Sequence, residues 1–317
     1  MKAIVQDTYG SADVLELRDI DRPVVEDDEV LVRVRAASVH PDVWHVLTGL
    51  PYVLRLMGAG LRKPKNPVPG TDLAGVVDSV GKNVTRFQPG DEVFGETMRG
   101  LQWVNGGAYA EYATAPEDAL ALKPANVTFE QAAAVPTSAL IALPSLRAGG
   151  EIQAGQRVLV NGAGGGVGAI AVQLAKAFGA DVTGVDCTSK LDMVRSIGAD
   201  QVIDYTQEDF TRRGERYDLI FDIPGNHSLS DCRRALTPGG NLRAHRARQL
   251  RRRDAPLGGT PAPHVETDGD VTVREPAAGR ALFDARQEGI YGSPEGAPRI
   301  RKAHAAHRQN LPAERGP

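Results

Sequence analysis

Apolar positions in residues 1–125 recur in short segments that are separated by glycine and proline. Valine at positions 30, 32 and 34 makes every second residue of one segment a β-branched apolar residue, a period that is typical of a strand. Turn signals such as Pro69-Gly70 and Pro89-Gly90 flank further short apolar segments at 76–77 and 92–94. This pattern predicts a β-rich domain, built as a barrel or a folded sheet, over residues 1–125.

A different pattern begins near residue 128 and continues to about 242. Thr128 and Gln131 have the spacing of a capping box that opens an alanine-rich helix. Short apolar strands then alternate with helical segments. The expected strands are 157–161, 181–185, 201–205 and 217–223, and the expected helices are 167–178, 190–197 and 228–236. Such alternation is typical of an α/β domain with a doubly wound parallel sheet, which binds ligands at the carboxyl edge of its strands.

The apolar pattern stops after Leu242. A further strand should begin at Asn241, but the chain continues RAHRARQLRRRD from residue 243, which is too polar for a central parallel strand. Residues 243–317 contain 13 Arg and one Lys, and Ile, Leu, Val and Phe make up about 13% of them, below the roughly 20% that a folded core requires. We therefore expect the doubly wound domain (126–242) to be incomplete and 243–317 to be an atypical, disordered tail.

Two interpretations of this tail follow from its composition. The tail is rich in Arg, Ala, Pro and Gly and has almost no Lys. A GC-rich gene that is translated out of frame gives this composition, so a frameshift is the main hypothesis. The alternative is a genuine basic tail that recruits a partner.

Overall composition indicates a soluble cytoplasmic protein. The formal net charge of −3 gives no reason to expect a nucleic-acid partner. Cys187 and Cys232 are too few for a disulfide framework or a four-cysteine zinc site. The start MKAIVQDTYG has no basic segment before an apolar run, so we expect no signal peptide, and no stretch reaches the roughly 18 apolar residues of a membrane span.

The connection between the strand 157–161 and the helix that follows it is rich in glycine. It reads NGAGGGVG over 161–168. Glycine permits a tight turn and close approach of a pyrophosphate, which the N-terminus of the following helix attracts. The strict G-x-G-x-x-G spacing is not met, although Gly162, Gly165 and Gly168 recur every three residues. The position between a strand and a helix predicts a dinucleotide site, with candidate residues Gly162, Gly164, Gly165, Gly166, Val167 and Gly168.

The end of the second strand of this domain carries two conflicting signals. Asp186 lies where an acidic residue usually accepts the adenosine ribose hydroxyls, which favours NAD(H). Lys190, with Ser189 beside it, could instead hold the 2′-phosphate of NADP(H). Solvated loop charges are a third interpretation. Asp222, at the end of the strand 217–223, completes the candidate cofactor-binding residues.

Seven stretches carry a resemblance to a known family. They are AASVHPDVWHVLTG (36–49), PGTDLAGVV (69–77), GDEVFGE (90–96), GGAYAEY (106–112), AAAVPTSAL (132–140), GAGGGVGAIAVQLAKAFGA (162–180) and GADQVIDY (198–205). In this order they resemble the medium-chain dehydrogenase/reductase superfamily, specifically its zinc-free quinone oxidoreductase-like branch, over residues 1 to about 242. The resemblance implies a GroES-like substrate domain, a Rossmann domain and a cleft between them for the nicotinamide.

The resemblance also bears on zinc and on cofactor choice. Zinc-using members of the superfamily carry Cys, Gly-His-Glu and Cys at places that match His40, Gly70-Thr71-Asp72 and Val135-Pro136 here, so two thiolates and a histidine are replaced. A metal site of His40, His45 and Asp72 is the less favoured alternative. In quinone oxidoreductase-like relatives a Lys and a Tyr fifteen residues apart hold the 2′-phosphate, and Lys190 and Tyr205 match that spacing. We therefore expect NADP(H), with NAD(H) as the alternative, and no zinc.

Together these observations predict an NAD(P)H-dependent oxidoreductase that transfers hydride to a quinone, an enone or another small carbonyl. Without zinc, hydrogen-bond donors must stabilise the developing negative charge, and the candidates are His40, His45, Tyr52 and Thr71. The alternatives are a chain whose catalysis is compromised by an out-of-frame C-terminus, and a zinc-type alcohol dehydrogenase. A homodimer is compatible with the resemblance, but it becomes doubtful if the last strands of the sheet are missing.

Overall fold

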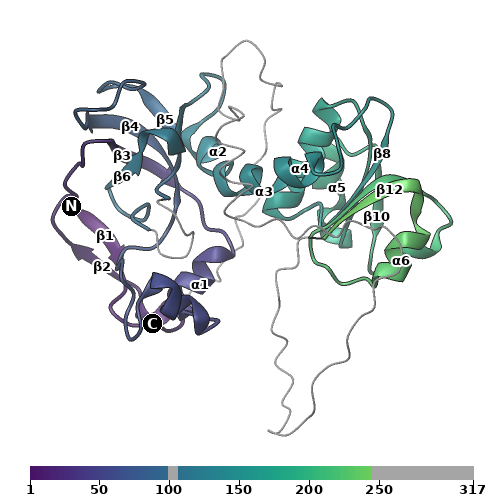
Figure 1. Cartoon of the computed structure of the whole chain (residues 1–317), viewed down its shortest axis with the longest axis horizontal. Helices are drawn as coiled ribbons and strands as arrows, with labels where there is room; N and C mark the ends of the chain where they lie inside the picture. The colour runs from purple at the N-terminus through teal and green to yellow at the C-terminus, as the bar shows by residue number, and fades with distance from the viewer. Residues whose placement is uncertain (99–105, 245–317) are drawn as a thin grey trace, which may run out of the picture. The chain divides into compact units, whose positions relative to one another are not determined.

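The computed structural model describes residues 1–98 and 106–244, which form two compact units that divide after Ile141, within helix α3 (Figure 1). The first unit contains β1 (Lys2–Val5), η1 (Ala12–Val14), β2 (Glu16–Asp19), β3 (Glu29–Ala37), α1 (Asp42–Thr48), η2 (Arg55–Ala59), β4 (Asp72–Val80), β5 (Glu92–Glu96), β6 (Tyr112–Pro116), η4 (Glu117–Ala119), β7 (Leu120–Leu122), α2 (Phe129–Ala133) and the start of α3 (Pro136–Arg147). The second contains β8 (Arg157–Asn161), α4 (Gly166–Ala177), β9 (Asp181–Asp186), η5 (Thr188–Lys190), α5 (Leu191–Ser196), β10 (Gln201–Asp204), η6 (Phe210–Arg212), β11 (Tyr217–Asp222), α6 (Leu229–Arg234) and β12 (Leu236–Ala244).

The first unit is built on an antiparallel sheet with strand order β6-β3-β4-β5-β7, and β1 pairs separately with β2. Val30 and Val32 of β3 are fully buried in one core with Leu73, Val93 and Leu120. Hydrophobic burial of this kind stabilises a sheet by about 1.5–3 kcal/mol for each large apolar side chain. The β-rich domain predicted from the spacing of apolar residues is confirmed.

Helix α2 starts as the sequence predicts. The Thr128 hydroxyl accepts the backbone N–H of Gln131, and the Gln131 side chain accepts the backbone N–H of Thr128. This capping box satisfies two N–H groups that a helix start leaves free. The helix then buries Ala132 and Ala133 against Ala74 of β4.

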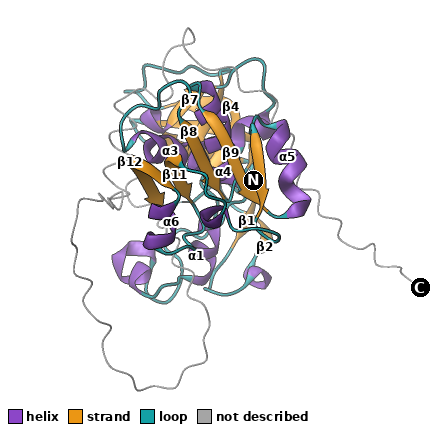
Figure 2. Cartoon of the chain, turned by 90° about the vertical axis from the view of Figure 1, so that its right-hand side faces the viewer, coloured by secondary structure: helices purple, strands orange, loops and turns teal. Residues whose placement is uncertain are grey.

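The second unit is a parallel sheet with strand order β10-β9-β8-β11-β12, and Figure 2 shows β9, β8, β11 and β12 side by side. The chain first moves outward from β8 to β9 and β10 and then returns to place β11 on the other side of β8. The order therefore reverses between β8 and β11. In doubly wound sheets the carboxyl ends of the strands at such a point are where ligands bind.

Alternate side chains of the central strands enter two separate cores. Val158 and Val160 of β8 pack with residues of α3, α4 and α5, among them Leu146, Val172 and Val194. Leu159 lies in the opposite core, which contains residues of η6 and α6. Both faces of the sheet are thus covered, which explains why its strands read as continuous apolar runs. The doubly wound α/β class is confirmed.

The expectation that the sheet ends with the strand 217–223 is wrong. β12 pairs in parallel with β11, and Leu242, Arg243 and Ala244 lie opposite Ile220, Phe221 and Asp222. The polar sequence does not exclude this strand, because its ladder consists of backbone hydrogen bonds and, among the described strands, it lies at the edge of the sheet. Leu242 fills one core, and Arg243 is buried as well. Helix α6 is also shorter than predicted, since the chain from Leu236 belongs to β12.

The remaining expectations for the tail and its reading frame lie outside the described residues, which end at Ala244. The division of the chain after residue 125 stays a prediction.

Candidate active site

The glycine loop between β8 and α4 has the geometry that a phosphate group requires. Gly162 has a φ of +84°, which only glycine adopts without strain. A Cβ on Gly168 would lie 2.0 Å from the carbonyl oxygen of Gly162, so the loop and helix pack too closely for any side chain there. Gly165 is the N-cap of α4 and, like Gly166, is exposed. The free N–H groups of the first turn and the helix dipole therefore face an accessible surface that suits an anion.

Asp186, the candidate ribose acceptor, is engaged by the protein. Its Oδ2 accepts the backbone N–H of Gly164 at 2.7 Å, and its Oδ1 accepts the backbone N–H of Cys187 at 2.9 Å. The residue is only 6% exposed. A Cβ on Gly164 would lie 2.9 Å from Asp186 Oδ2, so glycine is needed for this contact. Asp186 thus ties the glycine loop to the end of β9.

Lys190 and Tyr205 follow neighbouring strands, and their side chains are accessible from solvent. Asp186 and Asp204 are paired residues at the ends of β9 and β10, so the connections that follow them share one edge of the sheet. The Lys190 and Tyr205 side chains are substantially exposed, and Lys190 Nζ lies 3.8 Å from Asp186 Oδ1. The Ser189 hydroxyl is 3.3 Å from Cys187 Sγ. This edge of the sheet therefore offers a cation and a phenol, two groups that can donate hydrogen bonds to a phosphate.

Asp222 lies at the point where the strand order reverses. It is paired with Asn161 across β11 and β8, and the Asn161 amide donates to it at 2.8 Å. The same amide group lies 3.1 Å from Asn226 Oδ1, and the Gly225 N–H donates to Asp222. Asp222 is 2% exposed, so its carboxylate holds the turn after β11. Asn161 and Asn226 were not singled out in the sequence because no motif marks them.

The structure brings together two of the four candidate catalytic residues. His40 Nε2 and Thr71 Oγ1 are 2.9 Å apart, and the His40 side chain is nine-tenths buried. His45 instead places Nδ1 2.6 Å from the carbonyl oxygen of Leu50. Tyr52 is an exposed side chain whose ring lies beside Arg55, 4.9 Å from its guanidinium carbon to the ring centroid. His40 and Thr71 therefore form the candidate catalytic pair.

Asp72 lies under this pair and is almost completely buried. Its Oδ1 accepts the Thr71 and Thr137 hydroxyls, and its Oδ2 accepts the Ser38 hydroxyl and the Thr137 N–H. Burial raises the pKa of Asp72 above its ordinary value, while the charge of His40 and these hydrogen bonds oppose that shift. Thr137, at the start of α3, was missed because nothing in AAAVPTSAL distinguishes it.

The donor set at these positions does not fit zinc. Zinc sites use thiolate, imidazole and carboxylate ligands in a tetrahedral arrangement. Here His40 Nε2 is bonded to a hydroxyl, and both oxygens of Asp72 are occupied by donors from the protein. Over residues 1–98 and 106–244 no group of three metal-ligating side chains is present.

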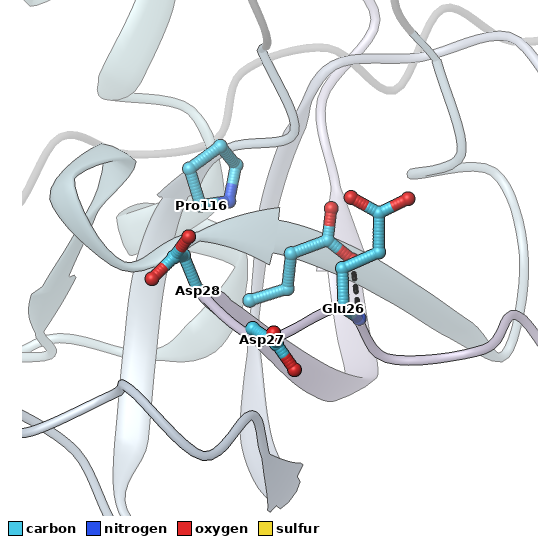
Figure 3. A pocket seen from close by; sticks show the side chains of 5 residues that line it. Glu26, Asp27, Asp28 and Pro116 are labelled. Carbon is cyan, nitrogen blue, oxygen red and sulfur yellow. Dashed lines mark hydrogen bonds between the residues drawn. The ribbon is translucent and has the colours of Figure 1, made fainter.

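A separate hollow of about 600 Å³ lies at the loop before β3. Figure 3 shows its lining residues, which are Glu26, Asp27, Asp28, Glu29 and Pro116. Its acids are engaged by neighbouring groups: Asp27 lies 2.8 Å from Lys82 Nζ, Asp28 accepts the Asn83 amide, and Glu29 accepts the backbone N–H of Glu26. None of the predicted site residues lies here, so this hollow is not the candidate active site.

Comparison with known proteins agrees with both units. Residues 26–125 match the alcohol dehydrogenase GroES-like domain family, and residues 166–243 match the zinc-binding dehydrogenase family. The human quinone oxidoreductase is 33% identical over 251 residues, which cover 76% of this chain and 72% of that protein. The chain belongs to the medium-chain dehydrogenase/reductase superfamily, in its quinone oxidoreductase-like branch.

Two further members of the superfamily are similar to this chain. The 2-methylene-furan-3-one reductase of Solanum lycopersicum is 37% identical over 71% of this chain, and the match spans 57% of the length of that relative. The Escherichia coli quinone oxidoreductase, solved in complex with NADPH, superposes with a TM-score of 0.64 and 28% identity, covering 76% of this chain and 72% of that one. No helix among the described residues of this superfamily member is long and apolar enough to cross a membrane.

Proposed function

We propose that this chain is an NADP(H)-dependent oxidoreductase that transfers hydride to a quinone or a conjugated enone without zinc. The quinone and enone relatives support the substrate class. Two features support dinucleotide binding. The first turn of α4 is exposed, and the glycine loop before it leaves no room for a Cβ at Gly164 or Gly168. When bound, the nicotinamide supplies the hydride, and the protein supplies binding, orientation and a proton. We expect the cytoplasm as its compartment.

The observation that favours NADP(H) is the engagement of Asp186. An acid that favours NAD(H) must offer its oxygens to ribose hydroxyls. Both oxygens of Asp186 instead accept backbone N–H groups, from Gly164 and Cys187. Lys190 and Tyr205 would hold the 2′-phosphate at the same edge, and the first turn of α4 would hold the pyrophosphate.

Reduction of a quinone consumes one hydride and one proton and yields the hydroquinone. Reduction of an enone likewise needs a proton after hydride addition. His40 suits the role of proton donor because imidazole changes charge near neutral pH. Its Nε2 is held by Thr71, and its Nδ1 is buried without a hydrogen-bond partner in the described structure. We assign the proton donation to Nδ1, because it is the ring nitrogen that no hydrogen bond holds in the described structure.

The test is oxidation of NADPH in the presence of a simple quinone or enone, with His40→Asn and His45→Asn compared. His40→Asn should lower kcat by about 100-fold or more, because general acid catalysis contributes about 10²–10⁴-fold. His45→Asn should have a smaller effect, since the His45 ring is bonded to the backbone. A protein that binds NADPH and reduces no quinone or enone would contradict the proposed function.

A further inference from the structure

Exposed apolar side chains gather on one part of the first unit, over α1 and η2. Six of the twelve large apolar side chains that are exposed in the described chain fall within residues 44–61, and each of the six is between 47% and 75% exposed. We call them the apolar patch: Trp44, Tyr52, Val53, Leu56, Met57 and Leu61. Single apolar residues are normal on a protein surface, but a concentration of them marks an interaction site.

The helical turns that lead into η2 present their apolar side to solvent. Tyr52, Val53, Leu56 and Met57 occupy positions i, i+1, i+4 and i+5, which share one side of a helix, and all four are exposed. Leu54, on the other side, is buried. A helix on the surface of a soluble protein normally buries its apolar side and exposes its polar one. Here the exposed side is apolar as well, so the fold leaves a surface for something else to cover.

Arg55 fixes these turns against the rest of the unit. Its guanidinium donates to the carbonyl oxygens of Thr48 and Gly49 at the end of α1, at 2.9 and 3.0 Å. It also lies over the Tyr9 ring, 4.1 Å from its central carbon to the ring centroid, and the Tyr9 hydroxyl donates to the carbonyl oxygen of Gly60 at 2.7 Å. α1 and η2 are therefore held side by side, and the apolar patch is one continuous surface (Figure 1).

A turn of basic residues borders the apolar patch. Arg62, Lys63 and Lys65 follow the patch in sequence, and their side chains are exposed. The backbone N–H of Lys65 donates to the carbonyl oxygen of Ala59 at 2.8 Å, which closes this basic turn onto the end of η2. Residues 43–71 contain four Lys and Arg and no acid, although the chain as a whole carries a net charge of −3. The rim of the patch is therefore cationic.

This charge decides between the occupants that an apolar surface can have. A symmetric contact with a second copy of the chain would bring the two basic turns toward each other, and like charges oppose such an interface. A bilayer with anionic headgroups attracts Lys and Arg instead, and its interface accepts Trp, Tyr and Leu side chains. Asp7, an acid whose charge interacts with Lys63, is already paired with Arg18 at 2.7 Å.

We propose that the apolar patch and the basic turn dock this protein on the surface of an anionic phospholipid bilayer. The apolar side chains enter the region between headgroups and acyl chains, and Arg62, Lys63 and Lys65 meet the lipid phosphates. The contact is a surface contact, in keeping with described helices that are too short or too polar to span a membrane.

Docking has a consequence for the substrate, which rests on the proposed function. The carbonyl oxygen of His40 accepts the Val43 N–H at the start of α1, the helix that carries Trp44. The candidate catalytic pair and the docked surface thus belong to neighbouring segments of the first unit. We therefore expect the substrate to be a quinone or enone with a long apolar chain, dissolved in the bilayer.

The test is cosedimentation of the full chain with vesicles of phosphatidylcholine, and with vesicles that mix phosphatidylcholine and phosphatidylserine in equal parts. The chain should bind the mixed vesicles more strongly, and added salt should weaken this binding because it screens exposed charges. A chain that stays in the supernatant with both kinds of vesicle, or binds both equally, would overturn the proposal. So would a dimer, seen by sedimentation velocity without lipid, that Leu56→Ser dissociates.

Substitutions at exposed positions separate the two contributions. Leu56→Ser should lower the partition coefficient about tenfold on both kinds of vesicle, because a large apolar side chain no longer leaves water. Arg62→Gln combined with Lys65→Gln should lower it on the mixed vesicles alone, about fivefold for each charge. Leu122→Ser, at an exposed leucine of β7, is the control and should bind as the parent does. Unchanged binding in both patch variants would overturn the proposal.

Trp44 reports whether the patch itself meets the lipid. The chain has two tryptophans, so Trp103→Phe leaves Trp44 as the single one. Its emission should shift to shorter wavelength on mixed vesicles, and spin-labelled lipid should quench it. Residues 243–317 contain 13 Arg, which would attract anionic vesicles in their own right. Binding that leaves the Trp44 emission unchanged would place the contact elsewhere and overturn the proposal.

Activity separates the docking from the proposed function. With a long-chain quinone carried in mixed vesicles, NADPH oxidation should fall in Leu56→Ser, whereas oxidation with a water-soluble quinone should equal that of the parent. Vesicle binding at the patch without reduction of either quinone would refute the oxidoreductase function alone. Reduction of the soluble quinone by a chain that binds no vesicles would refute the docking alone.

Discussion

The carboxylate of Asp186 accepts the backbone N–H of Gly164 at 2.7 Å, which fixes the glycine loop against the end of β9. A residue whose position in the sequence favours ribose binding therefore has a structural role in this chain. The consequence is that Asp186 and Lys190, two competing signals in the sequence, are expected to have separable effects on cofactor binding.

Asp186→Asn should weaken NADPH and NADH to a similar extent. The amide replaces one acceptor with a donor, so one of the N–H groups of Gly164 and Cys187 loses its partner, at a cost of about 1–3 kcal/mol. Fluorescence titration with both cofactors, together with thermal unfolding, measures the effect. Selective loss of NADH would show that Asp186 binds ribose instead.

Lys190→Ala should weaken NADPH by about tenfold to a hundredfold and leave NADH unchanged. A charge-assisted hydrogen bond to a phosphate contributes about 1–3 kcal/mol. Lys82→Ala is the control, because Lys82 is an exposed lysine of the first unit that pairs with Asp27. Equal loss for both cofactors would count against a phosphate contact, and tighter NADH binding by the parent chain would make Asp186 the deciding residue.

Two glycines of the loop should respond differently to substitution. Gly168→Ala places a Cβ 2.0 Å from the Gly162 carbonyl oxygen, and such overpacking costs about 1–3 kcal/mol of unfolding free energy. Gly165 has an ordinary φ of −87° and is exposed, and a Cβ there would lie 3.3 Å from the Gly162 carbonyl oxygen, so Gly165→Val should fold with a small shift of the loop. It should still lower cofactor affinity at least tenfold, about 1.4 kcal/mol, by blocking approach to the helix. Unchanged affinity would place the phosphates elsewhere.

Asp200→Asn should reduce stability at neutral pH but not in acid. Burial tends to raise the pKa of Asp200, but hydrogen bonds from Lys176 and from the Val182 N–H outweigh it, so the pKa lies below its ordinary value. A lowered pKa contributes stability above the unfolded pKa of about 3.9, which is lost as pH falls through the native pKa. Because the pair is partly exposed, we expect about 0.5–1 kcal/mol at pH 7.

The pH dependence of Asp200→Asn is measured by urea unfolding between pH 3 and 7. Asp192→Asn is the control, since the Asp192 side chain is almost fully exposed and forms a surface ion pair with Arg195. A difference from the parent that persists unchanged at pH 3 would mean that packing, rather than charge, carries the contribution of Asp200.

The purified chain should hold no stoichiometric zinc. Both oxygens of Asp72 are bonded to protein donors, and His40 Nε2 is bonded to Thr71, so binding a metal would break several hydrogen bonds. Elemental analysis after dialysis against metal-free buffer measures the zinc content per chain. One tightly held zinc per chain, lost in His40→Ala or Asp72→Asn, would contradict it.

The sequence by itself determined the β-rich and doubly wound classes of the two parts, the strands and helices from β8 to β11, and the place of the glycine loop. Strands such as β8 and helices such as α4 are specified locally, because apolar period and glycine punctuation act within a few residues. The capping box at Thr128 is local for the same reason. The one failure in the sheet, β12, arose because Arg243 and Ala244 have poor strand character, yet β11 offers them a ladder of backbone hydrogen bonds.

Only the tertiary structure decided what individual polar side chains do. Asp72, Glu96 and Thr137 are far apart in sequence and meet because β4 pairs with β5 in one register and α3 begins beside them. The Asp186 carboxylate accepts the backbone N–H of Gly164, 22 residues earlier, rather than facing solvent. A hydrogen bond depends on distances of a few tenths of an ångström between segments that the fold brings together, and no local pattern of residues encodes such a distance.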